Sequence, residues 1–387
     1  MPAVNVHIHP EILVWALSQV TKEKLGKKLT DNIKYWLDGS KTPTFRQIEE
    51  LSKKTYIPLG YFFLKKPPVE EMNPLRYRTL NSSELRMPSR DLIDTIFEMG
   101  TIQEWMTDYR KERQDNILEV PGSLKGHTDA YKIAKCIRKD LGLSVRWYEK
   151  CSNASDAFYK IRNLLEQCGI LVIMSGIIGK NTHRSLNINE FRAFAMTNEW
   201  APLIFINSAD SLGGRLFSLL HEVVHIWMGE SNLYTGGTHF FREIDPVEIT
   251  CNAAAAELAV PKLEFKKNWE QNQNSDIYAK IKEAASVFHC SEIVLARRAL
   301  DNKKIDLDLY EQVVSDTIKA YSQSRKKKNH GGNYYKNAQS RLDRAFVRAL
   351  CESINNGKTS YTEAYRLTNT SSKTFDKVVR GLGGVLW

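Results

Sequence analysis

Three features are missing from this chain of 387 residues, and each absence argues against a class of protein. The six cysteines form no CxxC pair, which argues against a disulfide framework and a cysteine zinc site and predicts reduced thiols. No run of 18 apolar residues is present, so we expect no membrane span. The opening MPAVNVHIHPEIL has no basic region followed by an apolar stretch, so we expect no secretory signal and a cytoplasmic protein.

Positive charge is in excess, with a formal net charge of +10. The excess is concentrated in residues 321–350, which hold only one acid, Asp343, against these basic residues: Arg325, Lys326, Lys327, Lys328, Lys336, Arg341, Arg344 and Arg348. The run Lys326, Lys327 and Lys328 is a candidate contact for nucleic acid or an acidic partner. A solvated linker and helix face explains the same pattern equally well.

The first 150 residues have helical patterns. Residues 9–66 predict a compact bundle of four or five short helices, with Thr21 as an N-cap, a stop at Gly39 and a Pro-Pro end. Residues 84–150 are again helical, with one long helix after Pro88.

A mixed region follows. We expect a helix at 156–169, strands at 169–176, 189–197 and 202–207, and then a helix starting near 208–211. Two helical blocks come later, at 276–300 and 308–323. A basic segment at 325–335 is expected to be a linker or exposed arm before a final helical unit at 337–382. The predicted fold is therefore mainly α with a small β-sheet, an α+β domain flanked by helical units.

The segment LFSLLHEVVHIWMG, residues 216–229, is a core helix by its apolar spacing, yet it carries His221, Glu222 and His225. Residues at i and i+4 lie on one helix face, so His221 and His225 can bind one metal ion. Zn²⁺ suits such ligands, and Glu222 can take a proton from a metal-bound water. The alternative is a buried His/Glu cluster whose polar groups are satisfied by hydrogen bonds alone. Burying these groups without a metal costs more free energy.

A third ligand is expected downstream, in the helical segment 245–261. Glu248 lies on its first turn, and Asn252 lies one turn later on the same face. Glu248 is the candidate ligand, and Asn252 can hydrogen-bond a ligating histidine. Glu243 and Asp245 are the nearest rivals for the ligand position. The small residues Ala253–Ala256 would let this helix pack closely against the first.

These motifs resemble those of the ImmA/IrrE family of metallopeptidases. The resemblance rests on LHEVVHIWMG, on the preceding NEFRAFAMTNEWAPLIFIN, and on a downstream pattern formed by Glu248, Asn252, Ala255, Ala256, Leu258 and Pro261. Residues 42–68 and 74–80 are similar to the Xre-type helix-turn-helix region of long members. Residues 331–350 are similar to members encoded beside a PIN-like ribonuclease toxin. Thr250 and Ala193 depart from common family residues, but neither change removes a catalytic group.

The resemblance implies a zinc peptidase domain with His221, His225 and Glu248 as metal ligands and Glu222 as general base. It predicts four segments: an Xre-like bundle at 1–68, a helical connector at 69–150, the peptidase domain at 151–324, and a basic linker with a helical unit at 325–387. It also implies a bacterial or phage regulator, an antitoxin or similar protein, that cleaves a repressor, a cognate toxin or another protein partner.

DNA binding by the first segment is a weaker prediction. A helix-turn-helix reads bases with the start of its second helix. Here KEKLGKKL, a turn and the helix ending at Trp36 are the expected pieces, but the stretch between Leu29 and Trp36 is short for that arrangement. Asn32 and Lys34 remain candidate contacts to bases or phosphates. The alternative is a structural or protein-binding bundle.

Three other residues are candidate substrate contacts. His239 and Tyr234 lie between the two metal helices in sequence, and His239 could help to hold an oxyanion. Arg192 is on a strand expected to border the cleft, where a substrate could add as a further strand. An exposed loop histidine and an ordinary Arg192 ion pair are the alternatives.

Two functions compete. In the first, the protein is a regulatory zinc endopeptidase that makes few cuts in one partner. In the second, it is an antitoxin or transcription regulator that works by binding DNA or a toxin, and the zinc site is structural or a sensor. The complete set of His221, Glu222, His225 and Glu248 favours the first function, and the basic segments favour the second.

Overall fold

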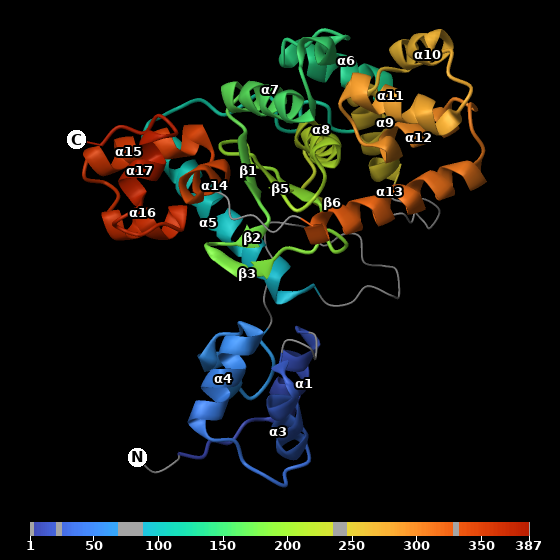
Figure 1. Ribbon diagram of the computed structural model, residues 1–387. Helices are drawn as coiled ribbons and strands as arrows, with labels where there is room; N and C mark the ends of the chain where they lie inside the picture. Colours follow the sequence, from blue (N-terminus) through green and yellow to red (C-terminus); the bar gives the residue numbers. More distant parts are fainter. Residues whose placement is uncertain (1–3, 21–24, 69–87, 235–245, 328–332, 387) are drawn as a thin grey trace. The chain divides into compact units, whose positions relative to one another are not determined.

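The structure is a computed structural model that describes residues 4–20, 25–68, 88–234, 246–327 and 333–386, with backbone only at 232–234 and 324–327. The chain divides into two compact units. The first comprises residues 1–73 and 78–97, and the second comprises residues 74–77 and 98–387. Each unit is described by itself (Figure 1). The predicted segments after residue 98 all belong to the second unit.

The first unit is a small helical bundle. Its elements are α1 (Pro10–Ser18), α3 (Lys27–Leu37), α4 (Phe45–Thr55) and the 3-10 helix η1 (Leu59–Phe63). Helix α4 starts with a reciprocal capping box in which Thr44 and Gln47 satisfy each other's backbone N–H groups. One apolar core joins the helices, and it includes Ile12, Leu29, Ile48 and Phe62.

The helix-turn-helix predicted for the first unit is not present around helix α3. The prediction of a turn between KEKLGKKL and the helix ending at Trp36 is wrong, because Lys27–Leu37 is one continuous helix. Leu29, Ile33 and Trp36 are buried at helical spacing, so the apolar pattern runs straight through the expected turn. Asn32 is half-buried on this helix. Lys34 is exposed, and its Nζ lies 3.5 Å from Oδ1 of Asp31. They do not begin a separate recognition helix.

The second unit is built on a four-stranded sheet with the order β1-β5-β4-β6. Strands β1 (Leu171–Ser175) and β5 (Leu203–Asn207) are parallel, and β4 (Ala193–Met196) is antiparallel to both β5 and β6 (Asn232–Tyr234). A separate hairpin joins β2 (Ile177–Ile178) and β3 (Asn181–Ser185). The three predicted strands are present, but β6 and the hairpin were missed because they are short.

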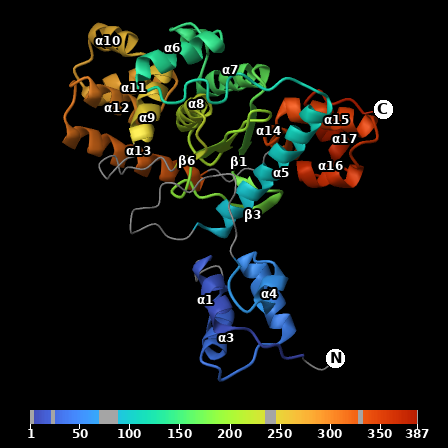
Figure 2. The same cartoon turned by 180° about the vertical axis from the view of Figure 1, so that it is seen from behind.

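Both faces of this sheet are covered, which explains why β1, β4 and β5 are buried at every position. On one face, Met174, Ala195 and Ile204 share a core with α7 (Ala154–Gln167) and α8 (Leu212–Met228). On the other face lies α5 (Arg90–Glu112), whose Gln103 side chain donates hydrogen bonds to the carbonyls of Met196 and Ala201. Figures 1 and 2 show the sheet between these helices.

Further helices share the core of α8: α6 (Ala130–Asp140) and α9 (Pro246–Ala259), which contact α8, and α10 (Lys262–Gln271), α11 (Ile277–Phe288), α12 (Glu292–Asp301) and the 3-10 helix η2 (Trp147–Lys150). The turn between α11 and α12 touches α8 closely, since a Cβ on Gly213 would lie 2.6 Å from the carbonyl carbon of Cys290. The fold is thus mainly helical with a small sheet, as predicted. No helix in the described part of the chain is long and apolar enough to cross a membrane.

The C-terminal helices belong to the same unit as the sheet. Helix α13 (Leu307–Lys327) continues through Arg325, so the start of the predicted linker is helical. After it come α14 (Tyr334–Ser340), α15 (Arg344–Asn355), α16 (Tyr361–Thr368) and α17 (Phe375–Arg380). Phe346 of α15 packs edge-on against Trp105 of α5, 5.4 Å between ring centroids.

Asp343 fastens this C-terminal part to the sheet. Its side chain is fully buried, and one carboxylate oxygen accepts a hydrogen bond of 3.0 Å from the backbone N–H of Val172 on the edge strand β1. The other oxygen caps α15 by accepting from the N–H of Phe346 at 3.0 Å. The single acid of the basic region is therefore a structural tie between two segments distant in sequence.

Replacing Asp343 by Ala should lower the free energy of unfolding by about 2–4 kcal/mol, because it removes a helix cap and leaves the buried N–H of Val172 unpaired. Urea unfolding measures this change. Asp376→Ala is the matched control: Asp376 pairs with Arg380 at the surface, and such pairs contribute less than about 1 kcal/mol. Equal losses in the two variants would contradict the role given to Asp343.

Candidate metal centre

Helix α8 carries three polar side chains through the core. Ser211 caps its N-terminus by accepting from the N–H of Gly214, and Gly229 ends it in the left-handed region with φ of 72°. His221, Glu222 and His225 lie between these ends and have no exposed surface. The helix thus holds ionisable groups where no water reaches them, which requires a compensating interaction.

Helix α9 brings a carboxylate to the two histidines. Glu248 lies on its first turn, and α9 packs along α8 through small buried residues, among them Cys251, Ala254 and Ala255. The predicted close packing of these two helices is therefore present. The rival ligands Glu243 and Asp245 lie outside the described residues.

The three side chains converge on one point. The Nε2 atoms of His221 and His225 are 3.0 Å apart, and they lie 3.4 Å and 3.1 Å from the two carboxylate oxygens of Glu248. A tetrahedral Zn²⁺ with bonds of about 2.0–2.1 Å places its ligand atoms roughly 3.3 Å from one another. The donor set and its spacing therefore fit a zinc ion held by His221, His225 and Glu248.

Protonation favours the same interpretation. Burial, followed by the proximity of His225, lowers the pKa of His221, so its imidazole is neutral at pH 7. Burial by itself raises the pKa of Glu248, but hydrogen bonds from His221 and His225 outweigh it, and the pKa ends below its ordinary value. An ionised carboxylate beside a neutral imidazole is the state in which these groups bind metal.

The environment of Glu222 indicates that the site holds a further ligand. Both of its carboxylate oxygens are buried and have no hydrogen-bond partner among the described residues. Burial raises the pKa of Glu222 well above its ordinary value, and the charge of Glu248 adds to this effect. A buried carboxylate without a partner is costly. The space beside the two histidines therefore suits a metal ion and a water molecule that Glu222 can hydrogen-bond.

Two residues of α9 lie close to the histidines. The proximity of Asn252 counters part of the lowering of the His221 pKa, and its role in orienting that ligand stays a prediction. Cys251 was not predicted: its Sγ lies 3.7 Å from Nδ1 of His225. Its position one turn after Glu248 was the only available signal, and a lone cysteine carries no motif of its own.

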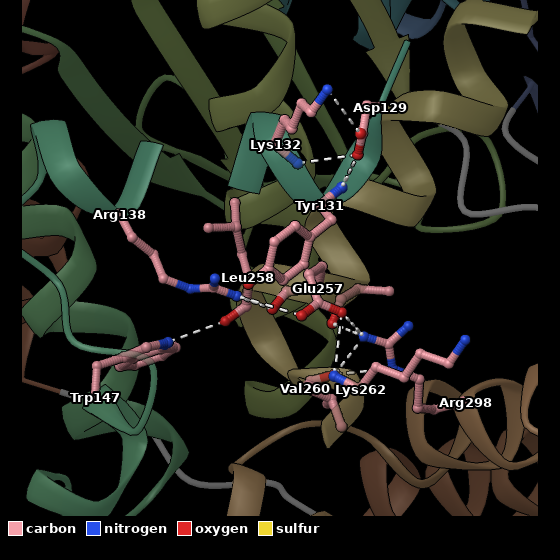
Figure 3. A network of polar contacts seen from close by, with 11 residues as sticks. Asp129, Tyr131, Lys132, Arg138, Trp147, Glu257, Leu258, Val260, Lys262 and Arg298 are labelled. Atoms are coloured by element: carbon pink, nitrogen blue, oxygen red, sulfur yellow. Dashed lines mark hydrogen bonds and ion pairs between the residues drawn. The ribbon is translucent and has the colours of Figure 1, made fainter. Parts of the chain in front are cut away.

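The far end of α9 is held by a polar network that sequence patterns did not indicate (Figure 3). Arg298 of α12 makes an ion pair of 2.6 Å with Glu257 and donates to the carbonyl of Val260. Arg138 of α6 donates to the carbonyl of Glu257, and Trp147 donates to that of Leu258 at 3.0 Å. These donors satisfy the last carbonyls of α9, and so they fix the helix that presents Glu248.

Of the other predicted site residues, Arg192 has its partner away from this centre. Arg192 makes an ion pair of 2.7 Å with the buried Asp210, which is the structural alternative considered for it. Strand β4 lies between β5 and β6, so it is not a free edge for a substrate strand. The backbone of Tyr234 pairs with Ala193, but its side chain is not described. His239 and Lys328 lie outside the described residues, and the side chains of Lys326 and Lys327 are likewise not described.

In the metal-free protein, Glu222 should make stability fall as the pH rises. Because its pKa is raised on folding, its contribution is fully present below the unfolded pKa and is lost on the way up to the folded pKa. Above roughly pH 4.3, the free energy of unfolding should fall by up to about 1.4 kcal/mol per pH unit. Urea unfolding with a chelator at several pH values measures it. Glu222→Gln should remove this slope, whereas Glu230→Gln, just past α8, should keep it. A wild-type slope equal to that of Glu222→Gln would contradict the burial cost.

Comparisons with known proteins agree with this centre. Residues 165–300, which contain all four cluster residues, match the family model described as the IrrE N-terminal-like domain, peptidase family M78. Residues 342–381 match a model described as a domain of unknown function, DUF8813. Searches of curated proteins and of solved structures found no match. The segment from 165 to 300 is therefore similar to IrrE N-terminal-like domains, and this similarity suggests a metallopeptidase-type domain.

Proposed function

We propose that this protein is a zinc metallo-endopeptidase of regulatory type. The observation that carries the proposal is the convergence of His221, His225 and Glu248 beside Glu222, whose carboxylate has no partner among the described residues. A scaffold that only needed a buried polar cluster would gain nothing from an unpaired acid. An enzyme needs that acid free to exchange a proton with water.

The chemistry follows from the residues around the site. Zinc, when bound by the two histidines and Glu248, acidifies water and polarises a peptide carbonyl. Glu222 accepts the proton of the attacking water and later passes it to the leaving amine. Asn252, one turn after Glu248, is the residue that would orient the ring of His221.

The burial of the site supports a restricted substrate range. His221, Glu222 and His225 have no exposed surface, so a peptide must displace neighbouring groups to reach them. A freely open cleft would cut many proteins, whereas a closed site acts on a partner that opens it. We therefore propose that the substrate is one specific protein, a repressor or a cognate toxin such as a PIN-like ribonuclease. An antitoxin or mobile-element regulator in the cytoplasm fits this activity.

The test is co-expression with the products of neighbouring genes, read by intact mass, with zinc measured on the same samples. We expect about one zinc ion per chain and one neighbour cut by the wild type. Chelation should stop the cleavage, and added zinc should restore it. A protein without metal would overturn the proposal. A neighbour that co-purifies uncut with the zinc-loaded protein would favour the binding regulator instead.

A further inference from the structure

The surface shared by α14 and α17 is rich in cations. Helix α17 buries Phe375, Val378 and Val379 on one side. Lys377 and Arg380 of the helix are exposed, and their spacing of three residues places them on one side, away from the buried residues. Lys373, in the turn just before the helix, is also exposed. We call this surface, together with Tyr334, Tyr335 and Lys336 of α14, the α14–α17 face.

The two helices of this face are in contact. The Nζ of Lys377 lies 4.1 Å from the ring centroid of Tyr335, and Gln339 donates to the carbonyl of Val378. The side chain of Tyr334 is 48% exposed, and its ring packs edge-on against that of Tyr335 with 5.4 Å between the ring centroids. A solvent-exposed aromatic ring therefore lies next to the cations. Lys336 is exposed on the same short helix. The face thus combines lysines with an available aromatic ring.

Few acids offset this charge. Asp343 is buried, Glu352 pairs with Arg113 of α5 at 2.9 Å, and Asp376 pairs with Arg380 at 3.0 Å.

This combination matches a single nucleic-acid strand. Cations that follow a phosphate backbone, with aromatic rings on which bases stack, are the common features of single-strand binding surfaces. A duplex fits less well. One helix of about 10–12 Å already fills a major groove of about 12 Å, and here α17 has α14 beside it. An acidic protein would use the cations but has no need of the exposed Tyr334.

We propose that the α14–α17 face binds single-stranded nucleic acid through its phosphates and through stacking on Tyr334. This binding is separate from the peptidase chemistry, because none of its residues lies near the metal centre in sequence or shares its helices. Lys373, Lys377 and Arg380 lie in the segment that matches a domain of unknown function, and the residues of α14 precede that segment.

The test is fluorescence anisotropy of the full chain with a labelled single-stranded DNA of about 30 nucleotides, its duplex, and a polyglutamate peptide of matched charge. Lys336→Glu/Lys373→Glu/Lys377→Glu should weaken single-strand binding at least about tenfold at low salt and reduce the salt slope by about 2. The control is Lys125→Glu/Lys135→Glu/Lys139→Glu, three exposed lysines elsewhere in the unit. Both triples shift the net charge by −6, from +10 to +4. The control should lose little affinity.

Tyr334→Ala should weaken single-strand binding about 5- to 100-fold without changing the salt slope. A triple Lys→Gln variant at the same three positions repeats the charge test with a smaller perturbation of the surface. Any of four outcomes overturns the proposal: no binding by the wild type, equal losses in the two Glu triples, tighter binding of the duplex, or equal competition by polyglutamate.

Discussion

Glu222→Gln should lower the rate of peptide-bond cleavage by about 10²–10⁴-fold and leave zinc binding intact. Glutamine has the shape of glutamate, so it fills the same buried space on α8 without disturbing His221 or His225. It cannot accept a proton from water or pass one to the leaving amine. Metal binding does not depend on it, because the three converging donor side chains are those of other residues.

The measurement follows the time course of partner cleavage by intact mass, with zinc determined on the same samples. Glu230→Gln is the matched control, since it makes the same change just beyond the end of α8 and should keep the rate within about twofold. A Glu222→Gln protein that retains more than about a tenth of the wild-type rate would show that another group is the base. A loss of zinc in this variant would show that Glu222 is a ligand.

The metal helices were predictable because their signals are local. His221 and His225 are separated by one turn of an apolar helix, and the geometry of that turn fixes their common face. Glu248 was predicted as the third ligand because it lies on the first turn of a second helix bounded by prolines. Neither prediction required knowledge of contacts between segments distant in sequence. The only assumption was that the small residues of the second helix let it pack closely against the first.

The residues that hold these helices in place were not predictable for the opposite reason. Glu257 and Arg298 form their ion pair across 41 residues, and Asp343 pairs with Val172 across 171. No periodicity links such partners, and each residue alone looks like an ordinary surface charge. In α3 the error was local: the family pattern suggested a turn, but the burial of Leu29, Ile33 and Trp36 on one face favoured a continuous helix.

Glu248→Gln should weaken zinc binding by roughly 10²–10³-fold, because it removes the one charged donor of the cluster and a single ligand carries several kcal/mol of the binding free energy. The structure makes this substitution informative. Glu248 is nearly buried, and the hydrogen bonds from His221 and His225 keep it ionised, so its charge faces the ion without competition from solvent. The amide keeps the size of the side chain but not the charge.

Competition with a zinc chelator measures the affinity, and thermal unfolding gives an independent reading. Zinc at about 1,000 times its dissociation constant stabilises the wild type by about 4 kcal/mol, and at the same zinc concentration this gain should fall to roughly 0.4–1.4 kcal/mol in Glu248→Gln. Ile249→Ala is the matched control, because Ile249 is exposed on the same turn and faces away from the cluster. If Glu248→Gln bound zinc as tightly as the wild type, Glu248 would not be the third ligand. Glu243 and Asp245, which lie outside the described residues, would then be the rival candidates.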